Sequence, residues 1–269
     1  MNKLMLSLAT LMLLALTSCG SDEPQDKIWY AQIPFVFHVV DQTEDVVSSC
    51  KLGVAYTEMN VDRNTAKMAV SVTLADGNEL AFELDQLHVK QDASKNGYVV
   101  TSSTMAKASG HTITDITFFV DMRQSGTVRH YFHMMVDDRY EVNGLSASMG
   151  FEVTQSEVLP PSSVSRTVFT GIYEFNITTL TTESKTCAFS VKGLGVFPLD
   201  NGVTYQGLKV VPTVEGYTIT SGDTPITPKE GGVSRLNNLH AKVNVHKRTF
   251  EAEFEVEQCA TVTATGSIQ

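Results

Sequence analysis

The sequence predicts an all-β protein, and three observations lead to this prediction. Apolar and polar residues alternate through 68–74, so that Met68, Val70 and Val72 share one face of a strand. Asp76-Gly77 and Asn96-Gly97 follow such runs and are typical of hairpin turns. Glycine, threonine and valine are plentiful, whereas runs of helix-forming residues are scarce.

Extended segments joined by short turns fill the first part of the chain. About eight strands are expected there, at 33–40, 50–59, 68–74, 80–89, 98–101, 116–122, 131–136 and 142–151. Pro160-Pro161 then interrupts the pattern, and two successive prolines cannot lie inside a sheet. The sequence therefore predicts a domain at 30–158, a proline-rich linker at 159–163 and a second domain at 164–269.

The second domain repeats the order of features found in the first. The matched segments are Phe35–Val39 with Tyr173–Ile177, Cys50 with Cys187, Asn96-Gly97 with Glu215-Gly216, and Ile113–Ile116 with Leu236–Leu239. We interpret this order as a tandem duplication. Each repeat has to cover its apolar face and its strand edges, which favours two antiparallel meanders that curl into up-and-down barrels or half-barrels.

The N-terminus resembles a bacterial lipoprotein signal. An apolar run from Leu4 to Leu16 follows Lys3, and it is too short to span a bilayer stably. Leu16-Thr17-Ser18-Cys19-Gly20 then matches a lipobox, which implies that residues 1–18 are removed and that Cys19 carries lipid. The alternative is an ordinary secretory signal in which this cysteine occurs by chance.

Residues 19–29 are predicted to form an acidic tether between the lipid and the folded domains. The run Gly20–Asp26 is similar to the acidic export tag of Bacteroidetes surface lipoproteins, although Cys-Gly-Ser-Asp-Glu departs from that pattern. An outer-membrane, surface-exposed location in the cell envelope is therefore expected. The formal net charge of -10 gives no electrostatic reason to bind nucleic acid.

The lipobox, the tether and the repeated Gly-Tyr-(Val/Thr)-(Val/Ile)-Thr segments together resemble the calycin-like, or lipocalin-like, lipoproteins of gut Bacteroidetes. The resemblance covers residues 30–269. It implies a β-barrel or half-barrel that binds an apolar ligand, and it supplies no catalytic residues. The Gly-x-Trp motif of true lipocalins is absent, and Trp29 is the only tryptophan.

Motifs of catalysis and metal binding do not appear in the sequence. It contains no Gly-x-Ser-x-Gly, His-Glu-x-x-His or phosphate-binding loop. His130 and His133 would point to opposite faces of one strand, so no shared metal is expected. Glutamates at every second position from Glu251 to Glu257 predict a solvated strand face, with a calcium site as the alternative.

The cysteines that remain after lipidation are Cys50, Cys187 and Cys259. We interpret them as thiols that pack as small apolar side chains. A disulfide between Cys187 and Cys259 is the alternative, because an exported protein can form one.

The hairpin of 116–136 is apolar on both faces, which predicts that something covers its outer side. Contact with the second repeat is the favoured interpretation. A ligand cavity is the alternative, and its candidate lining residues are Phe119, Met122, Phe132, Met134 and Met135. A partner protein or simple core packing are further alternatives.

From these patterns we expect a membrane-anchored, non-enzymatic lipoprotein that needs no cofactor and binds an apolar or amphipathic ligand. The alternative is a structural or protein-interaction surface lipoprotein without a small-molecule pocket. A third hypothesis is an envelope hydrolase whose active site is assembled from distant loops.

Overall fold

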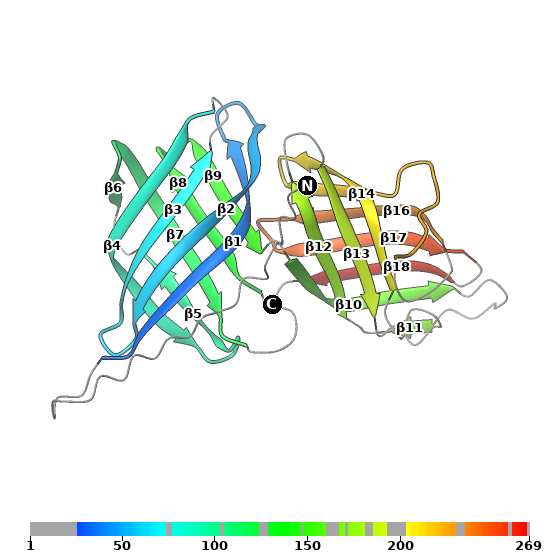
Figure 1. The fold of residues 1–269 in the computed structure, drawn as a ribbon, viewed down its shortest axis with the longest axis horizontal. Helices are drawn as coiled ribbons and strands as arrows, with labels where there is room; N and C mark the ends of the chain where they lie inside the picture. Colours follow the sequence, from blue (N-terminus) through cyan, green and yellow to red (C-terminus); the bar gives the residue numbers. More distant parts are fainter. Residues whose placement is uncertain are drawn as a thin grey trace, which may run out of the picture.

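The computed structural model describes residues 26–73, 77–102, 105–123, 129–146, 148–159, 167–169, 172–180, 185–192, 203–229, 235–257 and 260–267. These residues form strands and turns and contain no helix, which confirms the all-β prediction. Figure 1 shows two bodies side by side, with β1 to β9 in one and β10 to β18 in the other.

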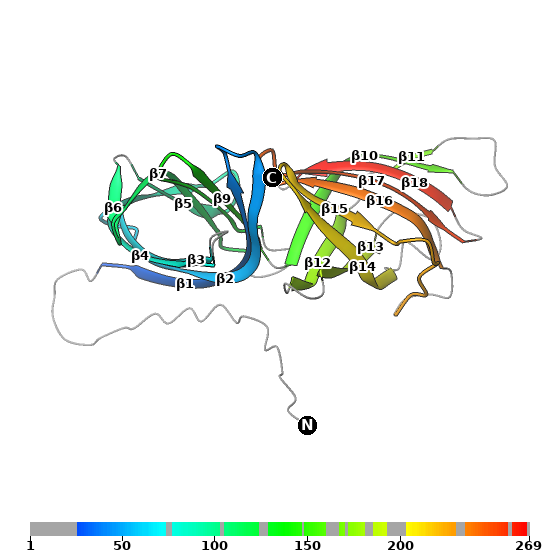
Figure 2. The ribbon, with the colours of Figure 1, turned by 90° about the horizontal axis from the view of Figure 1, so that it is seen from above.

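The first body is a closed antiparallel barrel, here called the first barrel. Its strands are β1 (Ile28–Asp41), β2 (Val46–Asn60), β3 (Thr65–Thr73), β4 (Glu79–Asp92), β5 (Gly97–Thr101), β6 (Ala106–Ala108), β7 (His111–Asp121), β8 (Tyr131–Val136) and β9 (Tyr140–Ser146). Consecutive strands pair from β1 to β5 and from β7 to β9, and the pairings β1–β9 and β5–β7 close the ring. Figure 2 looks into this ring, and the short β6 extends β7 outside it.

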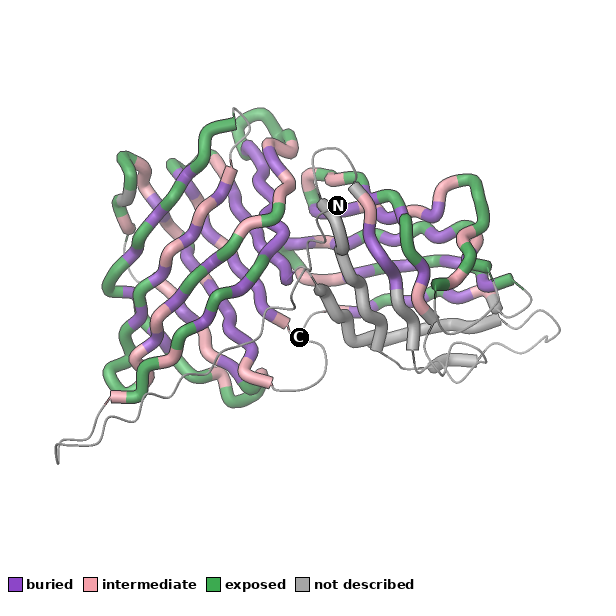
Figure 3. The backbone as a smooth tube through the Cα atoms, viewed as in Figure 1, coloured by how far each residue is buried: buried purple, intermediate pink, exposed green. Residues whose placement is uncertain are grey.

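The interior of the first barrel is filled by aromatic side chains from three of its strands. Phe35 and Phe37 of β1 meet Phe118 of β7 and Phe132 of β8, and the ring centroids of Phe37 and Phe132 lie 5.5 Å apart. All four side chains are buried, and Figure 3 shows buried and exposed residues alternating along the strands of this barrel. Because alternate residues of a strand face the interior, the alternation read from the sequence explains this core directly.

The second body is a sheet, here called the second sheet. Its strands are β10 (Ser148–Leu159), β11 (Thr167–Phe169), β12 (Ile172–Leu180), β13 (Lys185–Lys192), β14 (Val203–Thr213), β15 (Gly216–Thr220), β16 (Leu236–Asn244), β17 (Thr249–Val256) and β18 (Ala260–Ser267). The order is β11-β10-β12-β13-β14-β15-β16-β17-β18, and β10 also pairs with β18. Buried Phe189, Tyr205 and Phe254 belong to its core.

The break between the two bodies differs from the sequence prediction. β9 ends at Ser146 and β10 begins at Ser148, and β10 pairs with β12 and β18 of the second sheet. Residues 148–158 were expected to end the first domain, but they begin the second body. The prolines of the expected linker lie outside the described residues.

Local features of the first barrel recur in the second sheet about 120 residues later. β7 and β16 each contain an irregularity at a residue with positive φ, Asp115 in one and Asn238 in the other. β4 and β14 likewise share a positive-φ position, at Gln86 and Gly207. Three backbone hydrogen bonds recur as well. Ser102 N to Ile116 O corresponds to Ser221 N to Leu239 O. Met122 N to Asn96 O corresponds to Val245 N to Glu215 O, and Asp137 N to Thr112 O corresponds to Glu257 N to Arg235 O.

The pairings correct two of the sequence matches. β12 lies between β10 and β13 as β2 lies between β1 and β3, so Tyr173–Ile177 of β12 does not correspond to Phe35–Val39 of β1. Cys187 of β13 pairs with Leu208, next to a register shift. The same position in the first barrel belongs to Ala66 of β3, which pairs with Leu87. Cys187 therefore corresponds to Ala66 and not to Cys50. The matches of Gly97 with Gly216 and of 113–116 with 236–239 agree with the repeated hydrogen bonds.

A buried histidine, His130, lies at the end of the connection between β7 and β8. The Nδ1 atom of His130 accepts a hydrogen bond from the backbone N–H of Asp121 at 3.0 Å. Arg123 pairs with the buried Asp121 carboxylate beside it. Burial lowers the pKa of His130 to about 4, so its ring is neutral in the folded protein at pH 7.

We expect His130 to make the protein less stable in acid. Between pH 6.5 and 4 the His130 ring is protonated in the unfolded chain but not in the folded chain. The free energy of unfolding therefore decreases as the pH is lowered through this range. The contribution of His130 is about 3 kcal/mol at most. Urea unfolding at several pH values should show a shallower slope for His130→Asn than for the wild type. His240→Asn, at an exposed site, should retain the wild-type slope; equal slopes for all three proteins would contradict the prediction.

Candidate functional site

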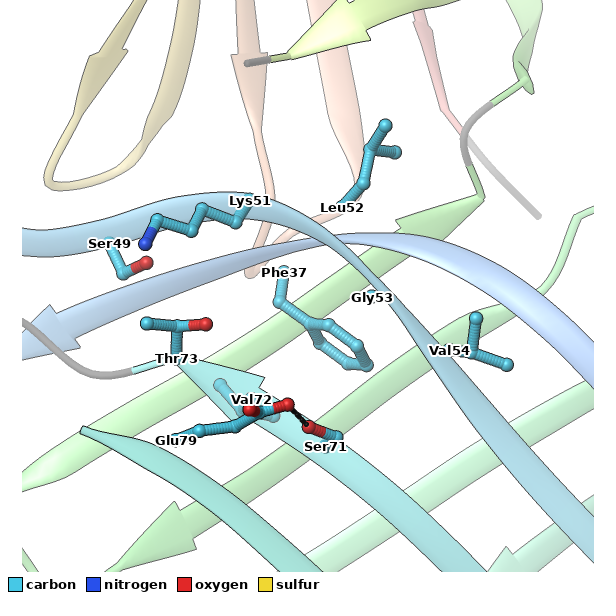
Figure 4. A pocket seen from close by; sticks show the side chains of 10 residues that line it. All are labelled: Phe37, Ser49, Lys51, Leu52, Gly53, Val54, Ser71, Val72, Thr73 and Glu79. Carbon is cyan, nitrogen blue, oxygen red and sulfur yellow. Dashed lines mark hydrogen bonds between the residues drawn. The ribbon is translucent and has the colours of Figure 1, made fainter. Parts of the chain in front are cut away.

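A hollow of about 250 Å³ opens between β2 and β3 of the first barrel. The two strands pair only from Ala55 and Val70 toward their hairpin turn. Beyond that point the two strands no longer pair with each other, and Ser49, residues 51–54 and residues 71–73 line the hollow. Figure 4 shows the side chains around this opening. The hollow therefore exists because two neighbouring strands stop pairing.

Phe37 and Gly53 form the apolar wall of the hollow. A Cβ atom at Gly53 would lie 2.7 Å from the Phe37 ring, closer than real Cβ contacts allow. Glycine at this position thus lets the ring of β1 lie against β2. The ring of Phe37 forms part of the lining as well as part of the barrel core.

The other lining residues give the hollow a polar rim. Ser71 donates a hydrogen bond from its hydroxyl to the Glu79 carboxylate, and Figure 4 draws this contact as a dashed line. Lys51 extends along β2 toward Ser49 and has no ion pair or hydrogen bond among the described residues. An ammonium group without a carboxylate partner beside an aromatic wall can bind the acid group of an amphipathic molecule.

Two further hollows lie on the same barrel, with volumes of about 630 and 550 Å³. The first is shallow because the outward residues Ala69, Ser71 and Ala81 of β3 and β4 are small. The second is lined in part by His111 and Tyr140. These surfaces adjoin the hollow at Lys51 through Val54, Ser71 and Glu79.

The five residues predicted to line a ligand cavity have other surroundings. Phe132 and Met134 lie in the core of the first barrel, and Met122 packs against that core. Phe119 packs against the second sheet, and Met135 is half-buried. None of the five lines any of the three hollows.

Contact between the two bodies covers the outer face of β7 to β9 and β1. Phe119 and Tyr131 stack with ring centroids 5.2 Å apart, and they share a buried cluster with Val36, Leu145 and core residues of the second sheet. The Arg248 guanidinium of the β16–β17 turn lies 4.1 Å from the centre of the Tyr131 ring. The hairpin that is apolar on both faces is therefore covered by the second body.

Polar groups complete this contact. His38 Nε2 donates a hydrogen bond of 2.7 Å to the Thr213 carbonyl, and burial lowers the pKa of this histidine. Glu141 is buried in the first barrel, and His246 of the second body places Nδ1 2.9 Å from its carboxylate. Gln42 donates a further hydrogen bond of 2.5 Å to the same carboxylate. The second body thus supplies a partner to His38 Nε2 and to the Glu141 carboxylate, whereas His38 Nδ1 is buried without a hydrogen-bond partner.

The remaining predicted sites are formed by cysteines and by the glutamates of β17. Cys187 carries a free, buried thiol, so the alternative disulfide with Cys259 is wrong. Cys259 itself lies outside the described residues, as does Cys19. Burial raises the pKa of the Cys187 thiol to about 12. Glu251 and Glu253 are exposed and lie opposite Lys242 and His240, as a solvated ladder requires.

Two kinds of element are absent from the described part of the chain. No group of three or more histidine, cysteine, aspartate or glutamate side chains there could hold a metal ion. No helix long and apolar enough to cross a membrane is present there either.

Comparison of the chain with protein-family models, curated proteins and solved structures finds no significant match. The family resemblance therefore depends on the sequence motifs, and function has to be argued from the geometry of the site. Lys51 was not among the residues predicted to bind a ligand. The sequence does contain a signal, because Ser49, Lys51 and Gly53 occupy alternate positions of one strand and so share the inward face, while Cys50 and Leu52 point outward.

We expect Phe119 to couple the two bodies and Phe118 to stabilise only the first barrel. Phe119→Ala opens the shared cluster, so unfolding in a calorimeter should split into two transitions. Phe118→Ala removes a ring from the barrel core and should destabilise the first barrel by about 3–5 kcal/mol. A single, unshifted transition for Phe119→Ala would show that the contact does not couple the bodies.

Proposed function

We propose that this protein is a lipid-anchored cell-envelope protein that binds a small amphipathic acid in the hollow between β2 and β3. The observation that carries the proposal is Lys51, whose ammonium has no charged partner among the described residues and lies at the rim of an apolar wall. Ser49 and Thr73 add hydroxyl groups beside it. A carboxylate at the rim and a hydrocarbon chain against Phe37 would satisfy both parts of the hollow.

The size of the hollow limits the ligand. Its volume of about 250 Å³ is below the usual range for drug-sized ligands, which favours a molecule of roughly ten non-hydrogen atoms. Glu79 repels a second acid group, although Ser71 engages its carboxylate. The ligand class is therefore a monocarboxylic acid with a short apolar chain.

The anchor of the proposed lipoprotein is lipid on Cys19, in an outer membrane with the two bodies facing outward. The support is the lipobox and the acidic tether described above. We further propose that the second sheet is a second calycin-like barrel produced by tandem duplication. The repeated hydrogen bonds and positive-φ residues support this origin.

A second candidate function is a structural or protein-interaction lipoprotein without a small-molecule site. It is favoured by one observation: the residues expected to line a cavity are occupied by core packing or by contact between the two bodies. The two candidates differ in what Lys51 does, since only the first requires its charge. The envelope hydrolase hypothesis has no supporting geometry among the described residues.

We expect Lys51→Met to weaken binding of a short fatty acid about tenfold, because the charge-assisted contact with its carboxylate is lost. The probe is hexanoate, titrated against the isotope-labelled protein and followed by chemical-shift changes. Hexanol, which lacks the charge, should bind the wild type and Lys51→Met equally.

Lys67→Met is the matched control, because Lys67 is exposed on β3 and lines none of the three hollows. It should retain wild-type affinity for hexanoate. Equal affinity of wild type and Lys51→Met for hexanoate would reject the amphipathic-acid site and favour the interaction protein.

We expect Cys19→Ala to abolish lipid anchoring, because this thiol is the proposed attachment point. Metabolic labelling with a fatty-acid analogue and membrane fractionation measure the effect in the native host. Cys50→Ala serves as the control and should remain labelled in the membrane fraction. A Cys19→Ala protein that is still labelled would contradict the proposed anchor.

A further inference from the structure

Exposed apolar side chains gather on the outer face of one hairpin of the first barrel. Ile28 and Tyr30 lie on β1, and Leu52, Val54 and Tyr56 lie on β2. Each of these side chains is 38–47% exposed. We call these five residues the apolar band. Six of the eight large apolar side chains that are markedly exposed in the described residues belong to β1 or β2.

The register of the hairpin makes these residues one continuous surface. Tyr56 lies opposite Gln32 and Val54 lies opposite Pro34, while Tyr30 stacks on Tyr56 with ring centroids 6.4 Å apart. Because alternate residues of a strand point to one face, Leu52, Val54 and Tyr56 share the outer side of β2. A clustered apolar surface of this kind marks an interaction site, whereas single exposed residues need no explanation.

The apolar band begins where the proposed tether ends. Ile28 is the first residue of β1, and only residues 20–27 separate it from Cys19 in the sequence. Nine residue-to-residue steps lead from Cys19 to Ile28, and they span about 32 Å at most when fully extended. A lipid on Cys19 therefore keeps Ile28, the first residue of the band, within that distance of the bilayer.

We propose that the apolar band lies against the lipid surface and orients the first barrel on the membrane. This inference depends on the lipid anchor of the proposed function. Tyrosine is favoured at the boundary between lipid and water, because its ring is apolar and its hydroxyl is polar. Leu52 and Val54 also line the hollow at Lys51, so the contact places that hollow beside the source of an amphipathic acid.

Attraction between charges does not drive this contact. The protein carries a formal net charge of -10. Near the band, the negative charge of Glu58 on β2 lies opposite the positive charge of Lys67 on β3. The band should therefore bind through apolar contact, with little dependence on salt and no requirement for anionic lipid.

Trp29, the only tryptophan, packs against the core of the first barrel, on the other side of β1 from the apolar band. The reporter is therefore placed in the band by Val54→Trp in a Trp29→Phe background. This lipidated protein is reconstituted in phosphatidylcholine vesicles with brominated acyl chains, which quench nearby indole rings. We expect its emission to fall by about half relative to unbrominated vesicles. Tyr30→Ser with Tyr56→Ser should remove most of this quenching while the protein stays in the vesicles.

Val211→Ser is the matched control, because Val211 is 55% exposed on the second sheet and outside the band. It should leave the quenching unchanged. An anchored reporter protein without quenching overturns the inference and leaves the anchor intact, whereas loss of the protein from the vesicles contradicts the anchor. A dimer of the lipid-free chain that Tyr30→Ser with Tyr56→Ser dissociates would also overturn it, since the band would then bind a second copy.

Discussion

The stacked rings of Phe119 and Tyr131 are the contact on which the arrangement of this protein depends. They lie on the outer face of a closed barrel, where side chains normally meet water. Covering them requires a second body, and the second sheet supplies its core residues and the Arg248 guanidinium. The same contact gives the neutral ring of His38 a hydrogen-bond partner at Nε2, and it adds His246 to the partners of the buried Glu141 carboxylate.

Much of the fold follows from the sequence by simple rules. The period-two alternation in 68–74 places Met68, Val70 and Val72 in the barrel core, as expected. The hairpin with two apolar faces predicted contact with the second repeat, and the structure confirms it through Phe119. The rules failed at the boundary, because paired prolines were taken to mark a domain break. β10 is instead built into the second sheet before the prolines occur.

The candidate site was harder to predict, for two physical reasons. Lys51 is a polar residue in an inward row, and the sequence alone does not show that β2 and β3 stop pairing beside it. The match of Cys50 with Cys187 was misleading because a buried thiol and an alanine satisfy the same small apolar position. The backbone irregularities at Asp115 and Asn238 identify equivalent positions better than side-chain identity does.

The short passage from β9 to β10 has a consequence for how the chain assembles. The chain emerges N-terminus first, whether from a ribosome or from an export channel, so β1 and β9 can meet and close the first barrel once Ser146 has emerged. The second sheet cannot join its two sides until β18, the last strand, is available to β10. Throughout that interval the finished barrel presents Phe119 and Tyr131 to water. The nascent chain is therefore most prone to aggregate after half of it has already folded correctly.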